Sequence, residues 1–97
     1  MRFVRDEEKN RRNRAKHKVS FESAVLVFDD PNALSLQDRF VAGEERWQTL
    51  GLVGGMVILL VAHTFYEENG EEIVRIISAR KATPGERRIY VENQKTQ

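Results

Sequence analysis

Four strand-like segments joined by short turns occupy the middle of the chain and restrict its fold more than any other feature. The segments cover residues 33–40, 45–53, 56–66 and 71–79. Gly43, the Gly54-Gly55 pair and the Glu68-Asn69-Gly70 run separate them, and such short connections predict an antiparallel meander. The segment 56–66 is apolar on both faces for most of its length, so we expect it to be a central strand.

Helix signals flank these strands. After a candidate strand at residues 2–5, Asp6 is a good N-cap for a helix that runs toward Lys18. This helix has few apolar residues, so we expect it on the surface with one narrow seam against the protein. Thr83, Pro84 and Glu86 form a capping box that begins a closing helix.

A second helix is expected from a cap at Ser20 through Phe28. Its core-facing stripe would consist of Phe21, Ala24, Val25 and Phe28, at the spacing of an α-helix. The whole chain, residues 1–97, is then one α+β domain of order β-α-α-β-β-β-β-α. It combines an antiparallel four-stranded sheet and a short N-terminal strand with two N-terminal helices and a C-terminal helix.

The charge is distributed unevenly although the net charge is only +1. Residues 1–20 carry a net charge of +5, residues 21–72 carry −8 and residues 73–97 carry +4. Such asymmetry is typical of a protein that binds a polyanion at one surface and a basic partner at another. The alternative is that the charges neutralise one another within the fold.

Several classes of chemistry are excluded. The chain has no cysteine, which removes disulfides, thiolate metal sites and thiol nucleophiles. The two histidines, His17 and His63, do not have the spacing of a metal-ligand motif, and Gly51, Gly54 and Gly55 match strand ends rather than a nucleotide loop. The charged N-terminus and the short apolar run at 56–62 predict neither a secretory signal nor a membrane span. We therefore expect a cytoplasmic protein without metal, cofactor or membrane contact.

The remaining candidates for chemistry are basic and hydroxyl side chains on the predicted strands and the closing helix. They are Arg46, His63, Arg75, Arg80, Lys81 and Tyr90. Such a set suits RNA cleavage without a metal, in which the 2′-hydroxyl attacks the adjacent phosphate while arginines balance the charge on the phosphorane. Histidine, lysine or tyrosine would transfer the protons.

Each candidate also has a structural interpretation. His63 could be a hydrogen-bonded histidine of the interior, and His17 could stabilise the end of its helix. Arg75 and Arg80 could form salt bridges with the acidic middle of the chain. On the sequence alone, a protein that binds RNA or another protein through the same basic surface, without catalysis, stays open as the alternative.

Six runs of the sequence closely resemble the BrnT family of ribonuclease toxins from bacterial type II toxin–antitoxin modules. They are D-E-E-K-N with Asn13, K-H-K-V-S-F (16–21), F-D-D-P (28–31), G-E-E-R-W (43–47), R-I-I-S-A-R-K-A (75–82) and E-R-R-I-Y (86–90). The resemblance implies a RelE-like toxin that cleaves RNA without metal, inhibits translation and forms a hetero-oligomer with a BrnA-type antitoxin. It also implies that operator DNA is bound only through the antitoxin.

With this resemblance we assign roles to the candidate residues. Arg75, Arg80 and Lys81 would bind phosphate and stabilise the transition state, while His63 and Tyr90 would transfer protons. The residues expected to contact substrate are Arg46, Lys9, Arg12 and His17. Lys18 stands where the family usually has glycine, so the end of the first helix should be less sharply defined.

Overall fold

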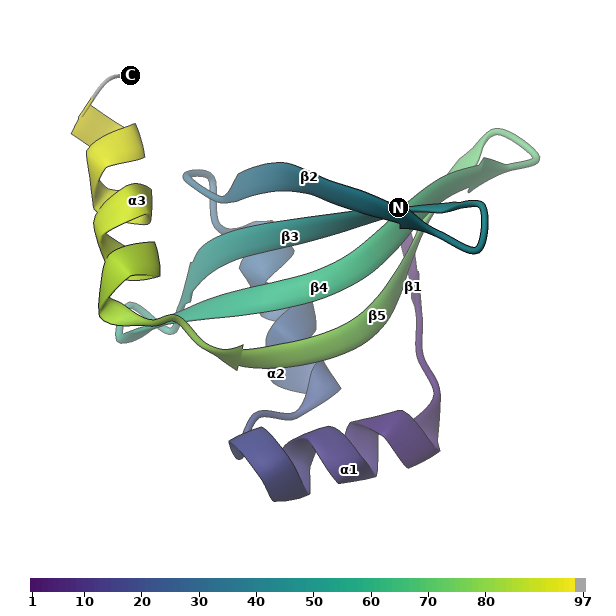
Figure 1. The fold of residues 1–97 in the computed structure, drawn as a ribbon, viewed down its shortest axis with the longest axis horizontal. Helices are drawn as coiled ribbons and strands as arrows, with labels where there is room; N and C mark the ends of the chain where they lie inside the picture. Colours follow the sequence, from purple (N-terminus) through teal and green to yellow (C-terminus); the bar gives the residue numbers. More distant parts are fainter. Residues whose placement is uncertain (96–97) are drawn as a thin grey trace.

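The computed structural model describes residues 1–95 and contains one five-stranded sheet (Figure 1). Its strands are β1 (Arg2–Val4), β2 (Leu34–Val41), β3 (Glu44–Val53), β4 (Val57–Glu68) and β5 (Glu71–Lys81), in the order β1-β5-β4-β3-β2. Strands β2 to β5 form the expected antiparallel meander, and β4 lies at its centre. The prediction from the apolar segment is therefore confirmed.

The N-terminal strand is part of this sheet. β1 pairs with β5 in parallel, with Phe3 opposite Val74, and extends the four-stranded sheet to five strands. The parallel direction was not predicted, because three residues of strand sequence do not specify their partner. The pairing places Phe3 against the main core.

Three α-helices and one 3₁₀ turn complete the fold within the described residues. They are α1 (Glu7–His17), α2 (Phe21–Val25), the 3₁₀ turn η1 (Leu26–Asp29) and α3 (Pro84–Lys95). In Figure 1, α1 and α2 lie on one side of the sheet, while α3 lies at the end of the sheet where β5 stops. One sheet face is thus covered by helices and the other is covered only at one end.

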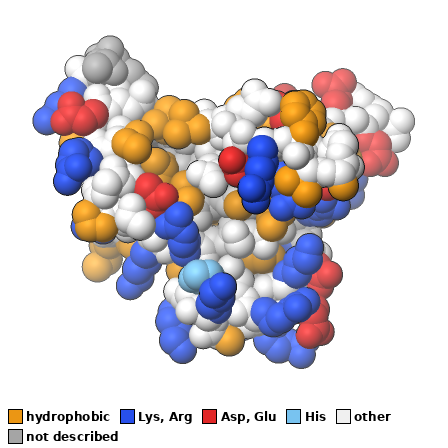
Figure 2. All heavy atoms as spheres, viewed as in Figure 1, with side chains coloured by type: hydrophobic (Ala, Val, Ile, Leu, Met, Phe, Trp, Pro, Cys, Tyr) orange, Lys and Arg blue, Asp and Glu red, His pale blue; other side chains and the backbone are white. Residues whose placement is uncertain are grey.

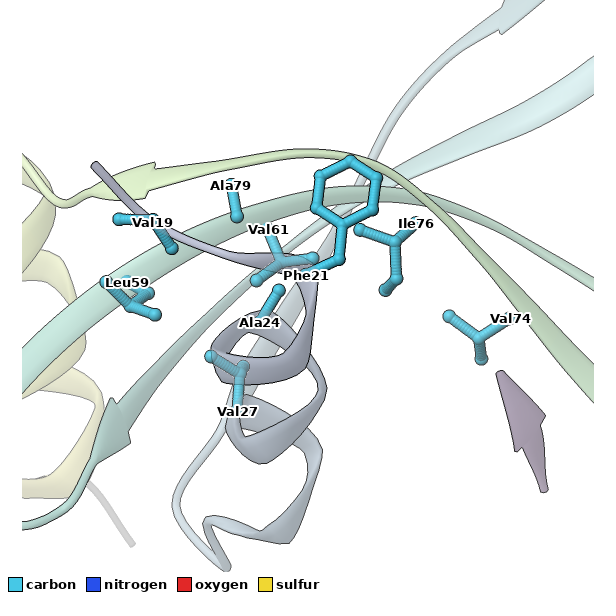
Figure 3. Close-up of a cluster of buried hydrophobic side chains, with 9 residues drawn as sticks. All are labelled: Val19, Phe21, Ala24, Val27, Leu59, Val61, Val74, Ile76 and Ala79. Atoms are coloured by element: carbon cyan, nitrogen blue, oxygen red, sulfur yellow. The ribbon is translucent and has the colours of Figure 1, made fainter. Parts of the chain in front are cut away.

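The main core lies between α2 and the sheet (Figure 3). It consists of Val19, Phe21, Ala24, Val27, Leu59, Val61, Val74, Ile76 and Ala79. The expected α-helix through Phe28 is wrong, because the chain tightens into η1 after Val25. A 3₁₀ turn has three residues per turn, so Val27 joins Phe21 and Ala24 in the fully buried core, while the expected Val25 and Phe28 are partly buried and pack against it.

Gly51 lies inside β3 and not at a strand end, contrary to the interpretation of the sequence. A Cβ atom at this position would lie 2.6 Å from Val27 Cγ1 and 2.9 Å from the Val27 carbonyl oxygen. Glycine is therefore needed here because η1 packs directly on the β3 backbone.

The seam between α1 and the rest of the protein is formed by two buried asparagines. Asn13 Nδ2 donates to the carbonyl oxygens of Val19 and Ala79, both at 2.8 Å, and its Oδ1 accepts from the Ala79 N–H at 3.1 Å. Asn10 Oδ1 accepts from the Phe21 N–H at 2.9 Å. These bonds satisfy backbone groups that would otherwise be buried without partners, so a helix with almost no apolar residues can still pack tightly.

A β-bulge in β5 lies beside this seam. Ile76 pairs with His63 and Ser78 pairs with Ala62, so Ile77 is an extra residue in β5. Because side chains alternate along a strand, the extra residue brings Arg75, Ser78 and Arg80 to one face of the sheet. The bulge explains why neither face of this segment has a regular pattern in the sequence.

Helix α1 ends sharply, which contradicts the expectation drawn from Lys18. Lys18 adopts the left-handed conformation, with φ 61° and ψ 25°, and its N–H donates to the Arg14 carbonyl oxygen at 2.9 Å. This is the geometry that glycine usually provides at a helix C-terminus. The helix therefore ends as sharply as it would with glycine, but the Lys18 side chain adds steric strain to the left-handed conformation.

Candidate functional site

The face of the sheet opposite α1 and α2 carries a row of polar side chains. We call it the open face and define it by Arg46 and Gln48 of β3, Ala62 and Thr64 of β4, and Arg75, Ser78 and Arg80 of β5. Their pairing across the strands follows from the register, in which Thr64 lies between Arg46 and Arg75. The structure thus brings together three of the arginines that the sequence singled out.

Thr64 and the two arginines beside it on the neighbouring strands, Arg46 and Arg75, each have a buried polar atom without a hydrogen-bond partner among the described residues. Thr64 is 2% exposed, and its Oγ1 has no hydrogen-bond partner within residues 1–95. The Nε atoms of Arg46 and Arg75 are also buried without a partner in this part of the chain. Buried polar groups in native proteins are almost always satisfied, so three exceptions in one row make this row the candidate site.

Acidic side chains hold two of the arginines on the open face. The Arg75 guanidinium is hydrogen-bonded to Glu44, at the beginning of β3, and both side chains are about two-fifths exposed. Glu44 was not singled out in the sequence, because its neighbourhood depends on strand pairing. The pair can open, since exposed ion pairs contribute little to stability.

Arg80 forms a stronger, bidentate pair with Glu86 of α3. Its two terminal nitrogens donate to the two carboxylate oxygens at 2.7 and 2.9 Å. These hydrogen bonds lower the pKa of Glu86 to about 2 against the opposing effect of burial, and Glu86 raises the pKa of Arg80. Glu86 also accepts from the Thr83 N–H at 2.9 Å, which confirms the predicted capping box.

The structure does not bring His63 to the open face. Its side chain is 3% exposed, lies on the helix-covered side with Phe28 edge-on to its ring, and borders an apolar pocket of about 210 Å³. Nδ1 donates to the Thr64 carbonyl oxygen at 3.1 Å, and Nε2 is 2.7 Å from Thr49 Oγ1. Burial lowers the pKa of His63, with a smaller opposing effect of the Thr64 carbonyl. This geometry is that of a neutral, hydrogen-bonded interior histidine.

Tyr90 is also buried, in a second small cluster with Leu50, Leu60 and Ala82. Its hydroxyl donates to Asp30 Oδ2 at 2.5 Å. Burial, together with the neighbouring Asp30 carboxylate, raises the pKa of Tyr90 to about 12. In this position the hydroxyl ties α3 to the turn after η1.

Asp30 is the acceptor at the centre of that connection. Besides Tyr90, it accepts from the N–H groups of Leu52 and Asn32 at 2.8 and 2.9 Å. Burial acts to raise its pKa, but the hydrogen bonds outweigh it and the pKa of Asp30 is lowered. The hydrogen bond from the Asn32 N–H shows that Asp30 also begins the turn that follows η1.

The other predicted site residues lie elsewhere. Lys81 is exposed at the end of β5 and, being next to Arg80, belongs to the opposite face. Lys9, Arg12 and His17 lie along α1 and border a groove beside the β5 bulge. Within residues 1–95, no three histidine, cysteine or acidic side chains gather closely enough to hold a metal ion. No helix in the same residues has the length and hydrophobicity to cross a membrane.

Sequence reasoning missed Thr64, Glu44, Glu86 as a partner of Arg80, and Ser78. Thr64 has a weak signal, since it is the first threonine after a long apolar run. Glu44 and Ser78 become visible only through the register and the β5 bulge, and the Arg80–Glu86 pair only through the position of α3 after β5.

Comparisons with known proteins show which family the chain resembles. The family model described as "Ribonuclease toxin, BrnT, of type II toxin-antitoxin system" matches residues 6–86. The chain belongs to the BrnT family. A crystal structure of the Brucella abortus ribonuclease toxin BrnT is similar, with a TM-score of 0.58 and 25% identity, over 86% of this chain and 97% of that one. The comparison with curated proteins gave no match.

Membership of the BrnT family confirms the resemblance seen in the sequence. A ribonuclease toxin of a type II system acts on RNA and has an antitoxin partner. The open face is the surface where this chain gathers Arg46 of β3 with Arg75 and Arg80 of β5, on the two sides of β4.

Proposed function

We propose that the protein is a metal-independent endoribonuclease whose catalytic site is the open face around Arg46, Thr64, Arg75 and Arg80. The observation that carries the proposal is the arrangement of Arg46 and Arg75 on both sides of a buried Thr64 whose hydroxyl has no partner within residues 1–95. Guanidinium groups bind phosphate oxygens in bidentate fashion and stay charged throughout a reaction.

The reaction would begin with attack of the 2′-hydroxyl oxygen of the RNA on the adjacent phosphorus. The 2′-proton goes to a base, a 2′,3′-cyclic phosphate forms as the bond from phosphorus to the 5′-oxygen of the next nucleotide breaks, and that oxygen takes up a proton from water. Arg46 and Arg75 would stabilise the charge of the phosphorane, and Thr64 Oγ1 would donate to one of its oxygens. Arg80 would bind a neighbouring phosphate about 13 Å further along the strands.

Glu44 is our candidate for the base that accepts the 2′-proton. It lies on the same side of β3 as Arg46 and is bonded to Arg75. A phosphate that binds Arg75 would compete with this carboxylate and release it for proton transfer. His63 and Tyr90, which the sequence suggested for proton transfer, would act in this proposal as structural residues.

The experiment is cleavage of a single-stranded RNA by the purified protein in excess chelator. We expect new ends that carry a cyclic phosphate and a 5′-hydroxyl, and no cleavage when the nucleotide at the cut site is 2′-deoxy. Cleavage that requires added metal would contradict metal independence. Binding of RNA without new ends would instead support the non-catalytic alternative.

Substitutions separate the proposed roles. Arg75→Ala and Arg46→Ala should each lower kcat about 100-fold or more, which is the size of effect seen when one transition-state donor is removed. Glu44→Gln should lower kcat more than it changes KM. Glu45→Gln, one residue away on the other side of β3, is the matched control and should leave cleavage unchanged.

For the cell we propose that the toxin acts in the bacterial cytoplasm, where its cleavage of RNA inhibits translation. A BrnA-type antitoxin would neutralise it in a hetero-oligomer, and operator DNA would be bound only through that antitoxin. The pairing of Arg75 and Arg80 with carboxylates supports an acidic antitoxin segment on the open face. Co-expression with the antitoxin should restore growth, and Arg80→Ala should abolish growth inhibition while the antitoxin still binds through Arg75 and the rest of its interface.

A further inference from the structure

A groove lined by basic residues lies between α1 and β5, beside the open face. Lys9, Arg12, Lys16 and His17 line it from α1, and Ile77 and Ser78 line it from β5. The groove has a volume of about 320 Å³ and is open to solvent. Among the described residues, no acidic side chain contributes to its lining.

The cations of this groove have no ion-pair partners within residues 1–95. On the same helix Arg11 pairs with Glu8, and just before it Arg5 pairs with Glu7 and Glu22. Lys9, Arg12 and Lys16 are exposed and make no such pair in this part of the chain. Figure 2 shows Lys and Arg side chains gathered over α1, while acidic side chains gather at the β4–β5 hairpin. The positive charge of the groove is therefore available to an anionic ligand.

The helix sets the spacing of these cations. Residues 9, 12 and 16 follow one another at i, i+3 and i+7, so they lie on one side of α1 and extend over about 10 Å of its axis. An extended polyanion that runs along α1 would meet one cation at each helical turn. A single small anion would need only one of them.

Ser78 connects this groove to the open face. It lines the groove, and the bulge at Ile77 places it on the open face between Arg75 and Arg80. Ser78 therefore borders both the groove with the cations of α1 and the open face with the arginines of the sheet. A single-stranded polyanion that is bound on the open face can extend past Ser78 into the groove while it stays in contact with the protein.

We propose that this groove binds the sugar–phosphate backbone of the RNA strand outside the cleavage site, independently of base sequence. The inference rests on the proposed function, because it requires RNA on the open face. Phosphate contacts from lysine and arginine fix the position of a strand and contribute most of its salt-dependent affinity. The groove would therefore extend the substrate site beyond the nucleotides that react.

Two triple variants of α1 test the proposal. Lys9→Gln/Arg12→Gln/Lys16→Gln removes three cations of the groove. Arg11→Gln/Arg14→Gln/Lys18→Gln removes the same number of charges from the other side of α1, where Arg11, Arg14 and Lys18 line a separate hollow. All six side chains are exposed, so both variants should fold, and circular dichroism with thermal melting checks this.

The first measurement is the Kd of each variant for a fluorescent single-stranded RNA made uncleavable by 2′-deoxy substitution. For the groove variant we expect at least tenfold weaker binding and a salt slope smaller in magnitude by about 2, since each phosphate that the protein neutralises adds about 0.7 to that slope. The matched variant should change both quantities much less. Equal effects in the two variants would overturn the proposal, since they would reflect net charge alone.

The second measurement is cleavage of a long RNA and of a trinucleotide. The groove variant should raise KM for the long RNA and leave cleavage of the trinucleotide unchanged. If the wild-type protein binds RNA but cleaves neither substrate, the proposed function fails while the Kd comparison still decides the role of the groove. A groove variant that fails to bind antitoxin and keeps full RNA affinity would assign this surface to the antitoxin and refute the proposal.

Discussion

The guanidinium of Arg80 holds the carboxylate of Glu86 through two parallel hydrogen bonds of 2.7 and 2.9 Å, and so joins the end of β5 to the first turn of α3. The same carboxylate accepts from the Thr83 N–H at the start of that helix. One side chain therefore completes a helix cap and neutralises an arginine of the proposed catalytic face. These two roles can be separated experimentally.

Acid should weaken the protein through Glu86. Its pKa is about 2 in the folded protein and 4.5 as a free side chain. Because the folded pKa is depressed, the stabilisation is present above about pH 4.5 and is lost as the pH falls toward 2, by roughly 1–2 kcal/mol after solvent screening. Urea unfolding of wild type and Glu86→Gln measures the difference. Glutamine preserves the capping box, so parallel pH profiles of the two proteins would refute the role of the charge.

Glu86→Gln should also strengthen the binding of RNA. Without the Glu86 charge, Arg80 is available to phosphate, and we expect Kd for single-stranded RNA to fall several-fold at low salt. Glu92→Gln is the matched control, since it removes one charge from α3 where Glu92 pairs with Lys95. Similar gains in the two variants would mean that only the net charge matters.

His63 should make stability depend on pH in a second, higher range. Burial lowers the pKa of His63, so the unfolded chain binds a proton more readily than the folded protein. Stability should therefore decrease as the pH falls below about 6.5, the ordinary histidine value. His63→Gln should be less stable at neutral pH, and its stability should change less between pH 7 and 5. An unchanged pH profile in the variant would show that His63 is not the group responsible.

Replacing Lys18 by glycine should stabilise the protein. A side chain in the left-handed conformation costs about 1 kcal/mol relative to glycine, so the replacement should raise Tm by about 4–8 °C in a domain of this size. Lys18→Ala keeps the Cβ atom and removes the charge, so it should give no such increase. If alanine and glycine raise Tm equally, the charge and not the backbone strain is responsible.

Tyr90→Phe should show whether Tyr90 acts in catalysis or only connects α3 to Asp30. The variant lacks the 2.5 Å hydrogen bond to Asp30, and its unfolding free energy should be lower by about 1.5–3 kcal/mol because the acceptor is charged. Below its Tm the variant should cleave RNA within about twofold of the wild-type rate. A large decrease of kcat with intact folding and unchanged Kd would instead restore Tyr90 as a proton-transfer residue.

The fold was largely predictable because its signals are local. Turn glycines, the cap at Asp6 and the Thr83–Glu86 box each act within a few residues. Apart from the end of α1 at Lys18, the errors concern residues that meet only in the folded protein. Gly51 could not be identified as a packing glycine without knowing that Val27 lies against it, and η1 depends on the same contact.

The site was predictable in its residue types and not in its geometry. Arg46, Arg75 and Arg80 were singled out for their chemistry, and they do share one face. His63 was singled out in the same way, but the alternation along β4 turns it away from its neighbour Thr64 and into the protein. Charge alone does not reveal which side of a strand a residue occupies.

Because Ile77 is an extra residue, the number of residues in β5 determines on which face of the sheet its arginines lie. Arg75 and Arg80 are separated by an odd number of positions, so in an uninterrupted strand they would point in opposite directions. Only the extra residue Ile77 places them on the same face of the sheet, and close to it Asn13 is hydrogen-bonded to the backbone of Ala79. Deletion of a single codon between them would leave every charged residue in place and still dismantle the arrangement. In this chain a change in the spacing of the arginines should therefore disrupt the open face as much as replacement of the arginines themselves.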